Sequence, residues 1–409
     1  FGEASTVLTI TNTAPSIDGV ITDGPVDEAS PLTITVSATD PAGRNDPLRY
    51  EFDFDDDGRF ELSNSTGLAR HTFADSGVFP VAVRVTDGDG GVTEGFIGVT
   101  VNNVAPTITS VISDDPVNEA SPVTVTVSAS DPAGAADPLT YAFDFDKDGA
   151  FEVSNNTGSG QHVFADNGTF TVGVRVDDGD GGETFASIAV TIDNVAPTIT
   201  SLSSNGPVTE GNPVVTLTVT AADVAGVNDP LTYEFDFDGD ETFEQRNGTG
   251  VAQHAFADSG VFPVAVRVTD GDGGVTVGRT TVTVANVAPT LSLSGEPFLD
   301  EGSVYTLGLS ASDPGADSIV EWSINWGDGS AIETVAGDAT SVTHTYADDG
   351  VFLISATARD EDGTFLATEA PVVTVNNVAP SLEITGATAV VEGEYTLTLA
   401  SGGDPGDDT

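Results

Sequence analysis

The sequence contains no cysteine and no methionine, and Lys147 is its only lysine. Without cysteine, the chain forms no disulfide, no thiolate zinc site and no cysteine nucleophile. Lysine and arginine together number 11, against 65 aspartates and glutamates, so the formal net charge is −54. Nucleic acid and anionic membrane surfaces are therefore not expected as partners, because binding them requires basic side chains that neutralise phosphates. The same charge favours small, hard cations as ligands.

Long apolar runs are missing as well. No stretch reaches the roughly 18 apolar residues of a membrane span, and no basic region followed by an apolar core marks a signal peptide. Hydrophobic residues still make up 38% of the 409 residues, so each of about two to four domains can bury a core.

The sequence repeats with a period of 91 or 92 residues, marked by an Ala-Pro-Thr/Ser motif whose proline recurs at Pro15, Pro106, Pro197, Pro289 and Pro380. A fixed period indicates tandem structural units. The chain begins at Phe1 and both of its ends fall inside a unit, so we expect a segment of a longer array. We divide it into the last strand of a preceding repeat (1–12), repeats 1 to 4 (13–103, 104–194, 195–286 and the divergent 287–377) and the start of a further repeat (378–409).

Within a repeat, hydrophobic residues alternate with polar ones. In repeat 2 the segments VTVTVSAS from Val123, LTYAFDFD from Leu139 and TFTVGVRV from Thr169 show this period of two. Such alternation, rich in Val, Thr, Phe and Tyr, is typical of β-strands. Clusters of Gly, Asp, Asn and Pro separate the segments, and no segment has the pattern of a helix. Six to eight short strands per repeat predict an all-β fold, a tandem array of immunoglobulin-like β-sandwiches.

Three phrases carry a family resemblance: YEFDFDDDG from Tyr50, HTFADSGVFPVAVRVTDGDGG from His71 and VNNVAPT from Val101. They resemble the polycystic kidney disease (PKD) type of immunoglobulin-like domain found in bacterial and archaeal surface proteins. The resemblance covers essentially the whole chain and implies a spacer, an adhesive module or an accessory domain. The linker VNNVAPT is also similar to the calcium-binding junction of cadherins, with Asn102 and Val104 where cadherins have acids.

Strand order predicts that acidic loops of neighbouring repeats meet at their junction. With strands lettered A to G, the A–B loop, the loop after strand C and the E–F loop share the downstream end of a sandwich, while the B–C and F–G loops share the upstream end. Ca²⁺ takes six to eight oxygen ligands of the kind these loops supply. We therefore predict Ca²⁺ at the junctions, where it locks the angle between neighbours. The predicted ligands are Glu28, Asp53, Asp55, Asp57, Asp75, Asn102, Asn103, Glu119, Asp131, Asp137, Asp144, Asp146, Asp148, Asp166, Asp178, Asp180, Asn194, Glu210, Asp223, Asp236, Asp238, Asp240, Asp258, Asp270, Asp272, Asn286, Glu301 and Asp313.

The acids also have simpler interpretations. Asp53 and Asp55 alternate with Phe52 and Phe54, as the solvent face of a strand with an aromatic core face does. The recurring phrase DGDGG suits a hairpin that binds no metal. An excess of acid also suits a high-salt habitat, where a hydrated acidic surface keeps proteins soluble.

The phrase Asp-x-Asp-x-Asp-Gly at 53–58 also occurs in EF-hand loops. An EF-hand needs flanking helices and a glutamate at its twelfth position, which is Asn64 here, so we reject that fold but retain an oxygen-rich loop. The fourth repeat keeps only Asp328 in this region, so a weaker site is expected there.

Enzyme motifs are not found. The four histidines share one repeated position before an aromatic residue, which predicts a hydrogen-bonding structural role rather than a catalytic base. No nucleophile elbow and no HEXXH motif accompany them, so we expect that this segment is not an enzyme. Four Asn-x-Ser/Thr sequons are either glycosylation acceptors or turn residues, at Asn64, Asn155, Asn167 and Asn247.

The sequence predicts a structural segment of a long extracellular or cell-surface protein, in a fibre, filament, stalk or sheath stiffened by calcium. Its partners are its own neighbouring repeats and, through edge strands, copies of itself. The alternative is the adhesive or substrate-targeting array of a cell-surface adhesin or secreted hydrolase, which needs an exposed aromatic platform. Trp322 and Trp326, the only tryptophans, have the even spacing of one strand face and are expected in the core. A catalytic role needs a pocket with convergent titratable groups.

Overall fold

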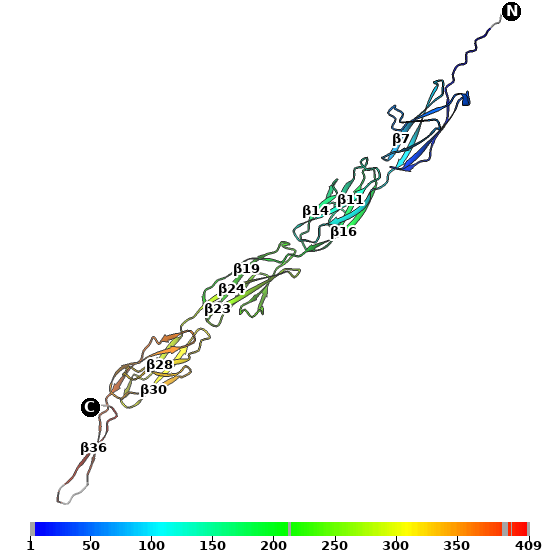
Figure 1. The fold of residues 1–409 in the computed structure, drawn as a ribbon. Helices are drawn as coiled ribbons and strands as arrows, with labels where there is room; N and C mark the ends of the chain where they lie inside the picture. Colours follow the sequence, from blue (N-terminus) through cyan, green and yellow to red (C-terminus); the bar gives the residue numbers. More distant parts are fainter. Residues whose placement is uncertain (1–4, 212–213, 387–391, 394, 407–409) are drawn as a thin grey trace, which may run out of the picture. The chain divides into compact units, whose positions relative to one another are not determined.

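The computed structural model describes residues 5–211, 214–386, 392–393 and 395–406. Regular structure in these residues is β-strand, apart from one 3-10 turn, η1 (Gly43–Asn45). The chain forms two compact units, Phe1–Val195 with repeats 1 and 2 and Ala196–Thr409 with repeats 3 and 4. Figure 1 shows the strands of each repeat, coloured along the sequence. In the described part of the chain, no helix has the length and apolarity that a membrane span requires. The predicted all-β fold is confirmed.

Repeat 1 is a sandwich of two sheets. One sheet has the strand order β1 (Ser16–Thr22), β3 (Pro31–Thr39), β6 (Leu68–Thr72), and the other has the order β2 (Val26–Asp27), β8 (Val92–Asn102), β7 (Gly77–Thr86), β4 (Arg49–Asp53), β5 (Leu62–Asn64). Strand β2 pairs with β8 in parallel, and the other pairs are antiparallel. This is the immunoglobulin-like arrangement that the alternating pattern predicted.

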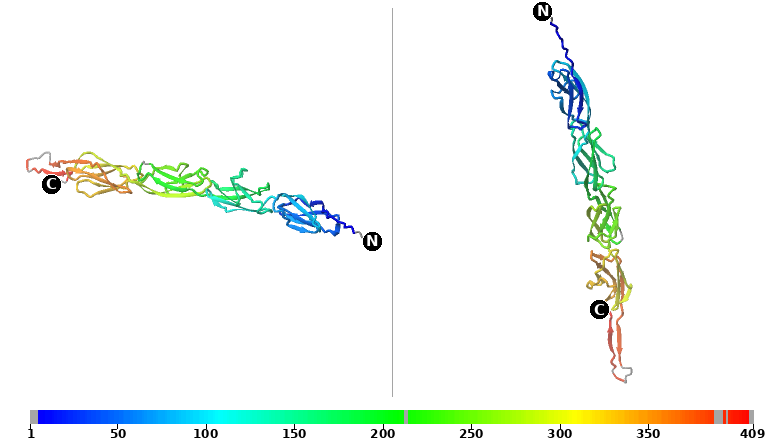
Figure 2. Two further views of the ribbon diagram at one scale, coloured as in Figure 1. Left: turned by 90° about the horizontal axis from the view of Figure 1, so that it is seen from above. Right: turned by 90° about the vertical axis from the view of Figure 1, so that its right-hand side faces the viewer.

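Repeat 2 has the same topology. Its sheets have the orders β14 (Ser159–Val163), β11 (Pro122–Ser130), β9 (Thr107–Ser113) and β10 (Val117–Asn118), β16 (Glu183–Asp193), β15 (Gly168–Asp177), β12 (Thr140–Asp144), β13 (Val153–Asn155). Figure 2 shows the strands of the repeats from two further sides.

In the second unit, repeat 3 keeps this topology, with the orders β17 (Thr198–Ser204), β19 (Val215–Ala222), β22 (Val251–His254) and β18 (Val208–Thr209), β24 (Val275–Ala285), β23 (Gly260–Thr269), β20 (Thr232–Asp236), β21 (Gln245–Asn247). Repeat 4 has the sheet β25 (Thr290–Ser294), β27 (Val304–Ser312), β30 (Ser341–Thr345), and its second layer divides into β26 (Phe298–Asp300), β34 (Val372–Asn376), β31 (Gly350–Leu353) and β29 (Glu333–Ala336), β28 (Glu321–Asn325), β32 (Ser355–Arg359), β33 (Thr364–Leu366). A hairpin of β35 (Ser381–Thr385) and β36 (Thr398–Gly403) begins the next repeat.

The division in repeat 4 coincides with a proline. Ile354 lies between β31 and β32, is fully buried, and donates its N–H to the carbonyl of Pro371 at 3.0 Å. Proline has no N–H to return to a strand ladder. The long F and G strands of the other repeats are therefore each interrupted here.

Each repeat packs its own core between the two sheets. In repeat 1 the inward side chains of β3, such as Leu32 and Ile34, meet Phe52 of β4, and all three are at most 1% exposed. Burying one such side chain contributes about 1.5 to 3 kcal/mol. In repeat 4 both tryptophans, Trp322 and Trp326, are 1% exposed, which confirms their predicted place in the core.

The sequon asparagine of repeat 1 closes a tight turn. Asn64 Nδ2 donates to the carbonyl of Leu68 at 2.9 Å, and Oδ1 accepts the N–H groups of Thr66 and Gly67. Asn155 and Asn247 make the same bonds in repeats 2 and 3. The nitrogen that a glycan would use is thus engaged in the fold, which favours the turn interpretation at these three positions.

Candidate metal sites

In each repeat, a buried glutamate accepts a hydrogen bond from the linker that leads to the next repeat. Glu28 comes directly after β2, is 2% exposed, and accepts the N–H of Val104 through Oε1 at 2.9 Å. Its own N–H donates to the carbonyl of Asn102 at 3.0 Å. Its second oxygen, Oε2, is buried and has no hydrogen-bond partner among the described residues.

The same arrangement occurs three more times. Glu119, Glu210 and Glu301 are each 2% exposed, and each leaves Oε2 buried without a partner in the described structure. Their Oε1 atoms accept the N–H groups of Val195, Val287 and Val378 at 2.8, 2.6 and 2.6 Å. A buried carboxylate oxygen without a partner is costly, so each of these four glutamates has an oxygen suited to a cation.

In the first unit, Glu28 of repeat 1 meets two acids from the B–C loop of repeat 2. Glu28, Asp131 and Asp137 each place one oxygen within 4.8 Å of the others. Asp131 uses Oδ1 to accept the N–H of Ala133, whereas its Oδ2, like Oδ2 of Asp137, is buried without a partner in the described residues. Oxygens bound to one Ca²⁺ lie up to about 5 Å apart, since each is 2.3–2.6 Å from the ion.

The electrostatics of this junction are unfavourable without a cation. Burial raises the pKa of Asp137 to about 6, and the charges of Asp75 and Glu28 add to the effect. Burial likewise raises the pKa of Glu28, against the opposing hydrogen bond from Val104 and with support from Asp131.

Asp178, from the F–G loop of repeat 2, behaves differently. Burial alone would raise its pKa, but hydrogen bonds from the Asn103 side chain, at 3.0 Å, and from the N–H of Gly182 hold the pKa below its usual value. The Oδ1 atom of Asn103 is buried without a partner in the described structure. The linker asparagine therefore anchors one acid of the junction and leaves an amide oxygen free to bind a cation.

In the second unit, repeats 3 and 4 form a comparable junction. Glu210, Asp258, Asp317 and Asp362 place one oxygen each within 4.8 Å of the others. Burial raises the pKa of Asp317 to about 7, with further contributions from Glu210 and Asp258. The repeats also share a backbone hydrogen bond, from the N–H of Ala316 to the carbonyl of Ala257 at 2.8 Å.

Sequence reasoning did not select Asp317 and Asp362. The two aspartates of the B–C loop are two positions closer together in repeat 4 than in repeat 2, since Asp317 follows Asp313 by four positions and Asp137 follows Asp131 by six. The sequence signal that could have identified Asp317 is a second aspartate in the B–C loop. Repeat 3 has such an aspartate as well, Asp229. Asp362 belongs to the segment DEDGT, which replaces the DGDGG of the other repeats, and this difference in sequence is why Asp362 was not selected.

The start of the next repeat approaches Glu301 in the same way. Gly406 donates its N–H to Asp404 Oδ1 at 3.1 Å, as Gly315 does to Asp313. A Cβ at Gly406 would lie 2.5 Å from Cδ of Glu301, so the loop after β36 contacts this carboxylate closely.

The acids after strand C form a separate group. Asp53, Asp55 and Asp57 gather with Glu61, within 4.8 Å of one another, while Glu28 gathers with acids of repeat 2. Asp53 pairs with Ala82, five positions along β7 from the strand's start near the junction, or roughly 17 Å of strand. The acids that the sequence assigned to one junction site thus fall into two groups.

Repeats 2 and 3 contain the same loop group, Asp144, Asp146, Asp148 and Glu152, and Asp236, Asp238, Asp240 and Glu244. Sequence reasoning missed the glutamates Glu61, Glu152 and Glu244. Their signal was a constant offset of four residues after the third aspartate in all three copies.

Most of the other predicted ligands hold loops in shape. Asn102 Nδ2 donates to Asp27, Asp180 N–H donates to Asp178, Asp272 N–H donates to Asp270, and Asn286 Nδ2 donates to Asp362. Backbone N–H groups are accepted by Asp75, Asp166, Asp223, Asp258, Asp270 and Asp313. Asn194 follows β16 in the linker of repeat 2.

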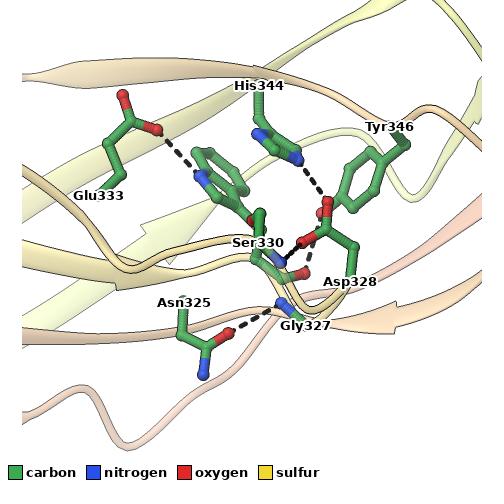
Figure 3. A network of polar contacts seen from close by, with 8 residues as sticks. Asn325, Gly327, Asp328, Ser330, Glu333, His344 and Tyr346 are labelled. Carbon is green, nitrogen blue, oxygen red and sulfur yellow. Dashed lines mark hydrogen bonds and ion pairs between the residues drawn. The ribbon is translucent and has the colours of Figure 1, made fainter.

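The repeated histidine packs against the loop group. His71, His162 and His254 stack on Phe54, Phe145 and Phe237, with ring centroids 4.1, 4.9 and 4.6 Å apart. In repeat 4, His344 stacks on Trp326 at 4.6 Å and its Nε2 lies 2.7 Å from Asp328 Oδ2 (Figure 3). Burial would raise the pKa of Asp328, but Ser330 and His344 lower it to about 2. Asp328, the aspartate that repeat 4 keeps in this loop, thus has a partner within the protein.

The donor set indicates the kind of ion that fits. Carboxylates and an asparagine amide, without cysteine or histidine, are the hard oxygen ligands that suit Ca²⁺. Because several of the oxygens are buried and unpartnered, the residues present at the junctions fit such an ion.

Comparison with known proteins agrees with the fold. A family model described as the PKD domain matches residues 12–101, 103–192, 194–284 and 286–375. No sequence among curated proteins matches the chain. Similar solved structures include the tetra-tandem repeat in the extending region of a large adhesion protein, 16% identical, covering 89% of this chain and 98% of that chain with a TM-score of 0.42. Mouse cadherin-23 EC22-24 is 22% identical, with 68% and 100% covered and a TM-score of 0.27. The four matched segments span most of the sequence, and the chain therefore belongs to the PKD domain family.

Proposed function

We propose that this chain is a structural segment of an extracellular repeat protein, in a fibre, stalk or sheath, and that Ca²⁺ at its junctions fixes the angle between neighbouring repeats. The observation that carries the proposal is the repeated glutamate. Glu28 binds the linker with one oxygen and leaves the other buried and unpartnered beside acids of the next repeat.

The energetics favour a bound cation. Two carboxylates 4 Å apart repel by about 1 kcal/mol in water and about 4 kcal/mol at the effective dielectric constant near a protein surface. Glu28, Asp131 and Asp137 supply three such charges with no basic residue among them. A divalent ion converts this repulsion into attraction, and because its ligands come from two repeats, it joins them.

A joined pair of repeats has fewer relative orientations than a pair linked by a short chain segment alone. In a tandem array each unit contacts mainly its neighbours, so the stiffness of the array is set junction by junction. Calcium in an extracellular fluid, at about the millimolar level where such modules bind it, would then hold the segment stiff.

Thermal unfolding tests the proposal. Calcium at about 2 mM should raise the melting temperature relative to chelator, because a ligand that binds only the folded state stabilises it. Additional NaCl at equal ionic strength should not reproduce the rise. Glu28→Gln keeps the acceptor for Val104 but removes the charge, so it should reduce the rise, whereas Glu94→Gln, on the exposed face of β8, should not. If NaCl stabilises the protein as well as calcium does, the acids serve solubility and the proposal fails.

The adhesive alternative has less support. It needs a platform of clustered, exposed aromatic side chains. Both tryptophans are buried, and the strongly exposed phenylalanines, Phe96, Phe185 and Phe298, lie one each in three different repeats. Of the tyrosines that the structure describes, only Tyr395 is more than 36% exposed. Histidines stacked on core rings likewise give no support to a catalytic role.

A further inference from the structure

The loop after strand β12 in repeat 2 gathers four carboxylates away from the junction residues. Asp144 is the last residue of the strand, Asp146 and Asp148 follow in the loop, and Glu152 is the last loop residue before β13. One oxygen of each lies within 4.8 Å of the others. The only lysine of the chain, Lys147, lies in the middle of this loop.

Backbone donors hold the loop in this form. Gly149 donates its N–H to Asp144 Oδ2 at 3.0 Å, and Phe145 donates to Glu152 Oε2 at 2.7 Å. These bonds fix both carboxylates to the backbone of the loop. Asp146 and Asp148 are exposed and each uses Oδ1 to accept a neighbouring N–H, which leaves their second oxygens available.

The buried aspartate is incompletely satisfied. Asp144 is 5% exposed, and its Oδ1 has no hydrogen-bond partner among the described residues. In repeats 1 and 3 both oxygens of the equivalent Asp53 and Asp236 accept backbone N–H groups. The unpartnered oxygen of Asp144 therefore distinguishes repeat 2 from repeats 1 and 3, and a cation held by the four gathered carboxylates would satisfy it.

Repeat 4 shows the alternative solution within the same chain. Repeat 4 keeps two acids in this region. Asp328 has His344 as a partner, and Glu333 accepts the Nε1–H of Trp326 at 2.9 Å (Figure 3). In repeat 2 the corresponding His162 stacks on Phe145. The histidine ring thus packs on the core ring in both repeats, and in repeat 4 it also pairs with the acid.

We propose that Asp144, Asp146, Asp148 and Glu152 bind a hard divalent cation of the Ca²⁺ type within repeat 2, at a site separate from the junctions. The ion would pin the β12–β13 loop to the body of the sandwich. This site does not depend on the junction model, since none of its ligands belongs to a neighbouring repeat.

Lys147 provides a local probe. Reductive methylation with ¹³C-formaldehyde labels only this side chain and the chain's amino terminus, and it preserves their positive charge. We expect the Lys147 dimethyl resonance of the 409-residue chain to shift saturably with added CaCl₂. Asp146→Asn keeps the acceptor for the Asp148 N–H. It should raise the CaCl₂ concentration at half-saturation about tenfold, because one charged ligand is lost.

Two controls separate this site from the junction and from bulk screening. Asp137→Asn, at the junction, and Asp18→Asn, exposed on β1, should leave the Lys147 response unchanged. NaCl at equal ionic strength should produce no saturable shift. The proposal is overturned if the resonance does not move with calcium, if NaCl moves it equally, or if Asp137→Asn abolishes the response while Asp146→Asn leaves it intact. Should Asp146→Asn fail to fold, Asp148→Asn serves as the second variant and the wild-type comparison of CaCl₂ with NaCl still decides.

Discussion

Glu28 accepts the N–H of Val104 at 2.9 Å, so a side chain of repeat 1 holds the first residues of repeat 2 while its second oxygen stays buried and unpartnered. The contact couples two properties of the junction. It orders the linker, and it concentrates negative charge where the repeats meet.

That coupling predicts a reversal for Glu28→Gln. In chelator the variant should melt at a higher temperature than the wild type, because the linker contact is kept and the repulsion from Asp131 and Asp137 is relieved. In calcium the order should invert, since the variant loses a charged ligand. Differential scanning calorimetry in both conditions measures the effect. A variant that is less stable than the wild type in both would contradict it.

Two junction aspartates, Asp137 and Asp317, predict that the stability of the fold depends on pH and that calcium suppresses this dependence. The folded pKa of Asp137 is about 6 and that of Asp317 about 7, whereas an unfolded aspartate titrates near 3.9. Between these unfolded and folded pKa values, the folded state binds more protons than the unfolded state. The contribution of these two groups to stability should therefore be most favourable below about pH 4 to 5 and decline as pH rises through 6 to 7.

Melting temperatures in chelator between about pH 5 and 8 test this sign. Asp137→Asn together with Asp317→Asn should flatten the profile, and saturating calcium should flatten it as well, since the ion takes the place of the protons. A profile in chelator that rises from pH 5 to 8 would show that these carboxyls are not destabilising when ionised.

Close packing at the second junction predicts a steric effect. A Cβ at Gly315 would lie 2.7 Å from Cδ of the buried Glu210, which is itself held by Val287. Gly315→Ala should thus separate repeats 3 and 4 slightly and reduce the calcium-induced rise in melting temperature. Gly248→Ala is the matched control, because its nearest atom would be 4.0 Å away. Equal responses of the two variants would count against a tightly packed junction.

The hydrogen-bonded pair of Asp328 and His344 in repeat 4 predicts a local loss of stability when the aspartate is replaced. Asp328 accepts N–H from Ser330 and lies 2.7 Å from Nε2 of His344. Because its folded pKa is about 2, its contribution should be present above about pH 4 and lost as pH falls through 2. Asp328→Asn should destabilise repeat 4 by about 2 kcal/mol at neutral pH, a typical value for hydrogen bonds to a charged group. Urea unfolding followed by the fluorescence of Trp322 and Trp326 reports on this repeat alone, and an unchanged midpoint would refute the prediction.

The fold and the position of the junction acids could be predicted from the sequence because both follow from regular patterns. Alternation places Leu32 and Ile34 inward, and strand order brings Glu28 to the same end as the B–C loop of the next repeat. Neither inference needs the conformation of a loop.

The missed residues all depend on loop conformation. Glu61 joins the Asp53 group because the loop folds back so that Glu61 accepts the N–H of Phe54, at 2.8 Å. Asp317 lies beside Glu210 although it follows the first aspartate of its loop by two positions fewer than Asp137 does, which no fixed repeat spacing reveals. Single-residue features of irregular segments are set by local hydrogen bonds rather than by a period.

The central claim is that calcium fixes the orientation of neighbouring repeats, and the absence of cysteine allows it to be measured directly. Ser37 and Ser128 occupy equivalent exposed positions on β3 and β11, so Ser37→Cys with Ser128→Cys gives two unique spin-label sites in repeats 1 and 2. Pulsed electron paramagnetic resonance should show a narrow distance distribution in calcium and a broad one in chelator, with NaCl unable to restore the narrow form. Equal widths in calcium and in chelator would contradict the account.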